Sequence, residues 1–319
     1  LGEQVPDNDA EADGLCRIID SAGDADLLAQ AVRRNTERLG PLWGRLAQLR
    51  FAGPPGSRPS ADQRAALIGA VRELLPQGAP DQPGEGLTAA DWRALRQGGS
   101  AWLATASLKA LPVPAPADEP LIEALADATH RQGLFTVWSG YTAQDIKSED
   151  RLRRPNDIRV ARRSGRLLHA LVRARQARRV LEIGSGFGVS GMYLNAALAR
   201  LPQGRLKTFE ANADWQPIAA ANIAVTGPLP ESVAGPFTPT SLAADERFDL
   251  VFIDAIHTPA AVQEQLDAVH PHLDPGALVV VDDVRFSPEM LDHWRGEAKS
   301  ARWAASFELF GRFGILEVA

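Results

Sequence analysis

The feature that most constrains the fold is a change of pattern near residue 178. From there on, short apolar runs alternate with segments of helical spacing, which is typical of a parallel sheet covered by helices. Strands are expected at the apolar runs 178–184, 205–211, 248–255 and 277–283. Helices are expected at 189–200, 213–224, 259–272 and 287–299, and over 155–176 before the first strand.

The last segment, RWAASFELFGRFGILEVA, has a different pattern. Its two apolar runs meet at Gly311, which predicts an antiparallel hairpin at the edge of the sheet. We therefore expect an α/β fold with a Rossmann-like, mostly parallel seven-stranded sheet and a C-terminal antiparallel hairpin.

The region before the sheet is expected to be an all-helical N-terminal domain, residues 1–130, followed by a second domain over 131–319. Pro/Gly-rich stretches separate segments of helical spacing at 24–50, 61–75, 88–97 and 119–132. Thr88 and Asp91 have the spacing of a helix-starting capping box, with Asp in place of the usual Glu.

Charge and cysteine content exclude several classes of protein. A formal net charge of −6 without a long run of like charge gives no reason to expect nucleic acid or a membrane as a partner. Cys16 is the only cysteine, so an intramolecular disulfide is impossible. The first residues are acidic, and no apolar run reaches the roughly 20 residues of a membrane-spanning helix, so we expect a cytoplasmic protein.

The turn after the first strand, VLEIGSGFGVSG, has two readings. Counted from Gly186 it matches G-x-G-x-x-G, and Glu210 follows about 20 residues on, as in a nicotinamide-dependent oxidoreductase. Counted from Gly184, the strand ends at Ile183 with Glu182 near its carboxyl end. A carboxylate there would repel a pyrophosphate but suits a cationic ligand such as S-adenosylmethionine.

The motif VLEIGSGFGVSGMYLNAAL, followed by GRLKTFEAN, FDLVFIDAIH and ALVVVDDV, resembles class I S-adenosylmethionine-dependent methyltransferases. Within that class the chain is most similar to the catechol and caffeoyl-CoA type of O-methyltransferase, over about residues 150–319. The resemblance implies that Glu210 binds the ribose hydroxyls of S-adenosylmethionine. It implies that Glu182 and the backbone of the turn, with Gly184, Ser185, Gly186 and Gly188, hold the methionine part of the cofactor, and that Asp254 also binds the cofactor.

Three carboxylates end neighbouring strands. Asp254 closes one strand, and Asp282 and Asp283 close the next, so their oxygens could bind a divalent cation such as Mg²⁺. In the resembling enzymes this position holds a metal through Asp, Asp and Asn, whereas here the last residue is Asp283, which leaves metal binding open. The alternative is that one of the pair caps the following helix and Asp254 orients a loop.

His257 lies three residues after Asp254, where the related catechol-type enzymes place a lysine that removes the acceptor's proton. A histidine can act as that base, and His257 and Asp254 are the predicted catalytic residues. The alternative is an ordinary loop histidine. Aromatic and basic residues before the sheet could cover the ligands or pack between the domains; they are Phe135, Trp138, Tyr141 and Arg154.

The sequence thus predicts an S-adenosylmethionine-dependent O-methyltransferase that acts on a small molecule or a modified peptide, with Mg²⁺ assistance open. The N-terminal domain would cover the acceptor or form a homodimer contact. A nicotinamide-dependent oxidoreductase and a non-catalytic cofactor-binding protein are the alternatives.

Overall fold

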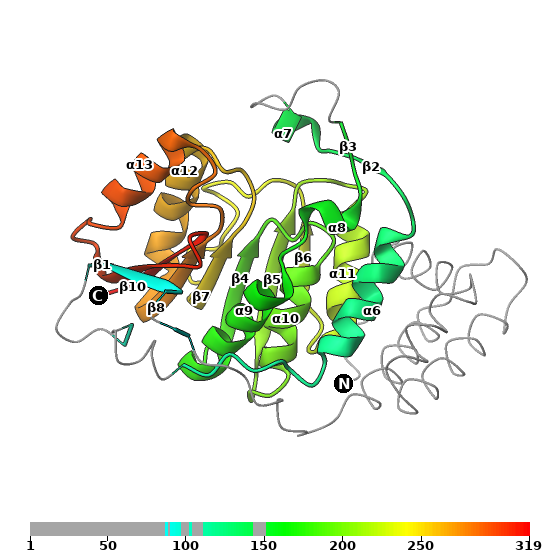
Figure 1. Cartoon of the computed structure of the whole chain (residues 1–319), viewed down its shortest axis with the longest axis horizontal. Helices are drawn as coiled ribbons and strands as arrows, with labels where there is room; N and C mark the ends of the chain where they lie inside the picture. The colour runs from blue at the N-terminus through cyan, green and yellow to red at the C-terminus, as the bar shows by residue number, and fades with distance from the viewer. Residues whose placement is uncertain (1–86, 89, 97–101, 104–110, 143–150) are drawn as a thin grey trace, which may run out of the picture.

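The computed structural model describes residues 87–88, 90–96, 102–103, 111–142 and 151–319. Its centre is an eight-stranded sheet in the order β1-β9-β10-β8-β7-β4-β5-β6 (Figure 1). The strands are β1 (Trp92–Arg96), β4 (Arg179–Ile183), β5 (Arg205–Glu210), β6 (Glu231–Ala234), β7 (Phe248–Ile253), β8 (Leu273–Val281), β9 (Trp303–Leu309) and β10 (Phe313–Val318). The helices are α6 (Glu119–His130), α7 (Ser139–Thr142), α8 (Pro155–Ile158), α9 (Arg162–Arg175), α10 (Val189–Leu198), α11 (Gln216–Thr226), α12 (Pro259–Val269), the 3₁₀ turn His270–His272 and α13 (Pro288–Glu297).

The predicted parallel sheet is confirmed. β4 pairs in parallel with β5 and β7, β5 with β6, and β7 with β8. β10 pairs antiparallel with both β8 and β9, so the C-terminal hairpin is also confirmed, although β1 pairs with β9 and forms that edge of the sheet in its place. The part of the chain from residue 131 supplies seven strands to this sheet, among them β6, which the sequence pattern did not locate.

Helices cover both faces of the sheet (Figure 1), and the side chains of β4 alternate between two buried clusters. Val180 of β4 packs in the core that α9, α10 and α11 cover, whereas Leu181 and Ile183 pack in the core that α12 and α13 cover. The central strands are apolar on both faces because both faces are covered.

The helix expected over 88–97 is wrong, because Trp92–Arg96 forms β1, an eighth strand antiparallel to β9. Asp91 does accept hydrogen bonds from the Thr88 amide and hydroxyl, as in a capping box. The chain then turns into the sheet, where Trp92 packs against Phe307 with ring centroids 6.0 Å apart. Pairing with a strand more than 200 residues away in sequence overrides the local helical pattern.

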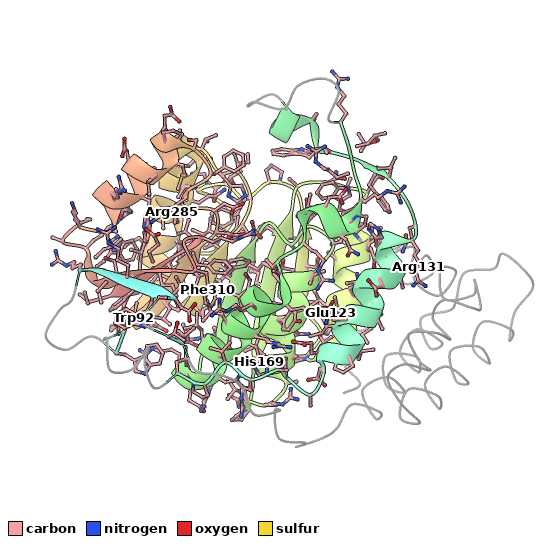
Figure 2. All side chains as sticks on the ribbon, in the orientation of Figure 1. Trp92, Glu123, Arg131, His169, Arg285 and Phe310 are labelled. Carbon is pink, nitrogen blue, oxygen red and sulfur yellow. The ribbon has the colours of Figure 1, made fainter. Side chains whose placement is uncertain are left out.

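The expected helix 119–132 is confirmed as α6, which lies against α8, α10 and α11. Its Glu119 accepts two hydrogen bonds of 2.6 Å from Arg166 of α9. Its Glu123, which Figure 2 labels on α6, pairs with Arg162 at 3.0 Å. α6 and β1 therefore pack with the sheet, although both precede residue 131. The expected helices 24–50 and 61–75 lie outside the described residues.

The helix expected over 155–176 is interrupted. It forms α8 and α9, with extended backbone at Arg159 and Ala161 between them. Before it, Phe135–Thr136 (β2) and Leu152–Arg153 (β3) form a small antiparallel pair. Among the described residues, no helix is both long enough and apolar enough to cross a membrane.

Candidate functional site

A cavity of about 230 Å³ lies at the carboxyl ends of β4, β5 and β7. In open α/β sheets, ligands bind at the carboxyl ends of two adjacent strands whose connections run to opposite sides of the sheet. The lining comes from the glycine turn, from the segments that follow β5, β6 and β7, from the chain before α9 and from α10, α12 and the residue before α11. The lining residues are 137–138, 153, 155, 158–160, 183–187, 189–190, 209–211, 215, 235–237, 254–257 and 265.

The glycine turn needs its glycines for conformation and for space. Gly184, Gly186 and Gly188 have φ values of +90°, +54° and +88°. A Cβ on Gly184 would lie 2.1 Å from the carbonyl oxygen of Asp254, and one on Gly188 would lie 2.9 Å from that of Ala219. The turn therefore passes closely under the backbone of neighbouring segments, and its amides border the cavity.

Glu210 joins β5 to the glycine turn. Its Oε2 accepts a hydrogen bond of 2.7 Å from the Gly186 amide, and its Oε1 accepts one of 2.8 Å from the Asn212 amide. Burial raises the pKa of Glu210 to about 7, against the lowering effect of these hydrogen bonds. The carboxylate lines the cavity with oxygens that can accept further hydrogen bonds from a ligand diol.

Ser185 is also well placed for a ligand. It lines the cavity and is 3% exposed, and its hydroxyl has no hydrogen-bond partner within the described part of the chain. A buried hydroxyl without a partner is uncommon, which fits a contact completed by a ligand.

Glu182 does not line this cavity. It is fully buried behind the turn, where it accepts hydrogen bonds from the hydroxyls of Ser190 (2.6 Å) and Thr208 (2.8 Å). Burial raises the pKa of Glu182 to about 7, and both hydrogen bonds oppose that shift. The predicted cofactor contact stays a prediction, and the geometry favours an indirect role through the glycine turn.

Asp254, Asp282 and Asp283 meet at the ends of β7 and β8, as the sequence predicted. A guanidinium lies among them. Asp282 is fully buried, and its Oδ1 and Oδ2 accept hydrogen bonds from Nε (2.6 Å) and Nη2 (2.5 Å) of Arg312. Arg312 Nε also lies 3.3 Å from Asp283 Oδ1.

This arrangement does not fit the predicted divalent-metal site. Both oxygens of Asp282 are engaged by Arg312, so that carboxylate could bind a cation only by giving up an ion pair. In the ranges that the structure describes, no group of three or more His, Cys, Asp or Glu side chains has an arrangement that could hold a metal ion.

His257 lies at the edge of the same cluster. Its Nε2 is 3.5 Å from Asp254 Oδ1 and 3.8 Å from Asp283 Oδ2. Burial lowers the pKa of His257, while the charges of Asp283 and Asp282 act in the opposite direction. A neutral imidazole that lines the cavity is suited to accept a proton from a bound ligand.

The pKa of Asp254 is raised well above its usual range, first by burial and then by the charge of Asp282. Asp254 also lines the cavity. A neutral carboxyl group at this position could donate a hydrogen bond as well as accept one.

The residues expected to cover the site are divided. Trp138 lines the cavity, whereas Phe135 packs on Phe187 with ring centroids 4.9 Å apart. Arg154 is exposed and begins α8, and its neighbour Arg153 lines the cavity instead. The side chain of Tyr141 lies outside the described residues.

Sequence reasoning missed two contributors. Asn212 donates a hydrogen bond of 2.7 Å to the Thr136 carbonyl and so ties the segment before α7 to the end of β5. Arg312 could have been found from the expected hairpin, because a strand antiparallel to β8 must begin beside the end of β8.

Comparison with known proteins gives a family for part of the chain. Residues 181–284 match a family model described as a methyltransferase domain. A catechol O-methyltransferase of Mycobacterium tuberculosis is 38% identical over 132 residues, which are 40% of this chain and 57% of that protein. A putative O-methyltransferase of Mycobacterium sp. (strain KMS) is 36% identical over 95 residues, 28% of this chain and 42% of that protein. The chain thus spans about half the length of these curated relatives.

Among solved structures, the O-methyltransferase TomG from Streptomyces achromogenes, in complex with SAM, is 30% identical, with 51% of this chain and 82% of that chain covered and a TM-score of 0.44. The family match and the curated relatives confirm the resemblance to class I S-adenosylmethionine-dependent O-methyltransferases. The matched range includes every predicted catalytic, cofactor-binding and metal-binding residue, whereas Arg312 lies beyond it.

Proposed function

We propose that this chain, whose residues 181–284 belong to the methyltransferase domain family, transfers the methyl group of S-adenosylmethionine to a hydroxyl oxygen of a small molecule. One observation carries the proposal: Glu210 and Ser185, which suit a nucleoside-bearing ligand, line the same cavity as His257. A cofactor and a proton acceptor would then share one space.

When bound, S-adenosylmethionine supplies a methyl group on a positively charged sulfur. Glu210 would accept hydrogen bonds from the ribose hydroxyls, and the glycine-turn amides with the Ser185 hydroxyl would contact the rest of the cofactor. Asp254 would contact the cofactor from the next strand. Glu182 would hold the turn from behind through Ser190 and Thr208.

His257 would remove the proton of the acceptor hydroxyl and hold it on the imidazole. The hydroxyl oxygen would take the methyl group from the sulfur that S-adenosylmethionine supplies, which would leave S-adenosylhomocysteine as the second product. Catalysis then rests on positioning and on deprotonation.

Phe286 favours a flat acceptor. It is 58% exposed, and its ring centroid lies 5.4 Å from that of His257. An exposed aromatic ring beside the proton acceptor suits an aromatic hydroxyl compound, which can stack on it. A modified peptide is the alternative acceptor.

Two measurements test the proposed function. We expect calorimetry to find tight binding of S-adenosylhomocysteine and none of NADH; the reverse would favour the nicotinamide-dependent oxidoreductase. Purified protein with methyl-labelled S-adenosylmethionine should label a phenolic compound from a panel of phenols, sugars and peptides. Cofactor binding without label transfer to an extract of the source cells would favour the non-catalytic binding protein.

Divalent-metal assistance, predicted from Asp254, Asp282 and Asp283, has no part in this mechanism, because Arg312 engages Asp282. A cytoplasmic location stays a prediction.

The Glu210→Ala variant should bind S-adenosylhomocysteine more weakly by about 1.5–3 kcal/mol, because a charged acceptor of the ribose hydroxyls is lost. Calorimetry measures the change. Glu231→Ala is the matched control. Glu231 begins β6, so it lies at the amino end of that strand and not at the carboxyl ends where the cavity lies, and its side chain is 63% exposed. An affinity equal to that of the unaltered protein would exclude the ribose contact.

Binding of S-adenosylhomocysteine should also tighten as the pH rises from 6 to 8. The pKa of Glu210 is raised to about 7, so below that pH the protonated carboxyl must lose its proton to accept both ribose hydroxyls. The dissociation constant should therefore fall by up to about tenfold per pH unit below the pKa. Glu210→Gln should have a flat profile; a slope equal to that of the unaltered protein would assign the titration to another group.

The predicted role of the N-terminal domain, acceptor cover or homodimer contact, is tested by truncation. A chain of residues 87–319 keeps β1 and α6 and should bind S-adenosylhomocysteine as the full chain does, but lose the dimer or show a raised KM for the acceptor. A chain of 131–319 should also be less stable, because β1 and α6 are removed from the sheet and from α10. Light scattering measures the oligomeric state, and steady-state kinetics measures the KM for the acceptor. If the 87–319 chain has the same oligomeric state and the same KM as the full chain, residues 1–86 have neither role.

A further inference from the structure

The C-terminal hairpin brings a cation into the acidic cluster of Asp254, Asp282 and Asp283. Arg312 follows the turn formed by Phe310 and Gly311, whose φ values are +55° and +62°. β10 runs antiparallel to β8 with Gly314 opposite Val281, so this turn lies beside the residues that follow β8. The Arg312 carbonyl accepts a hydrogen bond of 3.0 Å from the Val284 amide, which fixes the backbone there.

The Arg312 side chain is held as firmly as its backbone. Two parallel hydrogen bonds, 2.6 and 2.5 Å long, join its guanidinium to the carboxylate of Asp282, which is fully buried. Bidentate pairs of this kind are among the strongest hydrogen-bonded contacts of proteins, and their planar geometry fixes both partners. The Arg312 Nε also lies 3.3 Å from Asp283 Oδ1.

We propose that the Arg312 guanidinium occupies the position of a divalent cation at this cluster and supplies a single positive charge there, so that methyl transfer by this chain does not require a metal ion. The charges are complementary within this chain. Asp283, where the resembling enzymes have Asn, adds one negative charge to the cluster, and Arg312 Nε lies 3.3 Å from its Oδ1. A metal could reach Asp282 only by breaking a buried ion pair, which is unfavourable.

Arg312 is also a positioning residue for His257, the proposed general base. It contacts Asp283 through Oδ1, and the other oxygen of Asp283 lies 3.8 Å from His257 Nε2. The guanidinium thus orients the carboxylate that faces the imidazole. The claim of metal independence rests on the proposed function, whereas exclusion of a metal from the cluster is a property of the folded chain alone.

The deciding experiment measures Mn²⁺ binding to full-length protein without cofactor or acceptor, by electron paramagnetic resonance and calorimetry. The unaltered protein should show no saturable binding. Arg312→Ala should gain at least about 10²-fold in Mn²⁺ affinity, because a like charge within about 4 Å of the ion is removed. Arg312→Ala with Asp283→Asn, which restores the Asp, Asp, Asn set, should also bind Mn²⁺. The control is Arg295→Ala, which removes an equal charge from an exposed pair with Asp292 on α13 and should bind none.

Added Mn²⁺ should raise the melting temperature of Arg312→Ala and leave that of the unaltered protein unchanged. Arg312→Lys keeps the positive charge but not the bidentate geometry. Its Mn²⁺ affinity should lie between those of the unaltered protein and Arg312→Ala, and this variant is measured in place of Arg312→Ala if the alanine variant does not fold. Stoichiometric Mn²⁺ binding by the unaltered protein, or no gain in any folded Arg312 variant, would overturn the proposal.

Activity provides the second reading. Methyl transfer by the unaltered protein should be the same in EDTA and in Mg²⁺, and a requirement for metal would overturn metal independence. If no acceptor is methylated while the Mn²⁺ result holds, the proposed function fails and the exclusion of metal by Arg312 stands.

Discussion

Replacing His257 with alanine is expected to lower kcat for methyl transfer by about 10²–10⁴-fold, the usual contribution of a general base. The affinity for S-adenosylhomocysteine should change by less than about twofold, because the cofactor contacts are assigned to Glu210, Ser185 and the glycine turn. Steady-state kinetics with the identified acceptor, combined with calorimetry, separates the two effects.

The geometry explains why the effect should fall on the rate. His257 contacts the acidic cluster at 3.5 and 3.8 Å, lines the cavity and lies beside the exposed ring of Phe286. In that position His257 acts only at the step in which the hydroxyl of the methyl acceptor loses its proton. Loss of the imidazole therefore affects the transition state more than the bound ground state.

The matched control is His272→Ala. His272 precedes β8, and its Nδ1 lies 3.0 Å from the Glu246 carbonyl oxygen. It therefore lies near the amino end of β8, whereas the cavity lies at the carboxyl ends of the strands. Its variant should keep the full rate. A His257→Ala variant with an unchanged kcat would show that another group, or water, takes the proton.

Much of the sheet could be predicted because its strands are buried on both faces. Runs such as LVFI and LVVV have no polar face, and only a strand covered by helices on both sides suits them. The glycine turn was equally predictable, since positive φ angles at Gly184 and Gly188 leave few other residues possible.

β1 could not be predicted, for a physical reason. Its five residues, WRALR, have good intrinsic helix propensity, and Thr88 and Asp91 do make the hydrogen bonds that often start a helix. What makes it a strand is the open edge of β9, about 210 residues further on, and the contact of Trp92 with Phe307. No local window of the sequence contains that partner.

The site residues divide in the same way. The sequence placed Asp254, Asp282 and Asp283 at one edge because strand ends follow from strand boundaries. It could not tell which carboxylate faces a ligand and which is paired inside the protein. Asp282 is paired inside the protein because Arg312 donates hydrogen bonds to it, and Glu182 because the hydroxyls of Ser190 and Thr208 do so.

The glycine turn should tolerate no side chain at its first position. Gly184→Ala should destabilise the fold by roughly 3–5 kcal/mol, the sum of an unfavourable φ and a steric clash in a packed region. The φ of +90° is one that alanine rarely adopts, and the three atoms nearest to the new Cβ are backbone atoms of one neighbouring segment: Asp254 O at 2.1 Å, Asp254 C at 2.7 Å and Ala255 Cα at 2.9 Å. None of these atoms belongs to a flexible side chain that could move away.

Thermal unfolding measures the effect, with an expected fall in melting temperature of roughly 6–20 °C at about 2–4 °C per kcal/mol. Gly133→Ala is the matched control, because Gly133 has a φ of +106° but nothing within 4 Å of a new Cβ. It should lose only the smaller contribution from the unfavourable φ and keep its affinity for S-adenosylhomocysteine. If Gly184→Ala unfolds at the same temperature as Gly133→Ala and binds the cofactor product as well, the close approach of the turn to Asp254 cannot be what shapes the cavity.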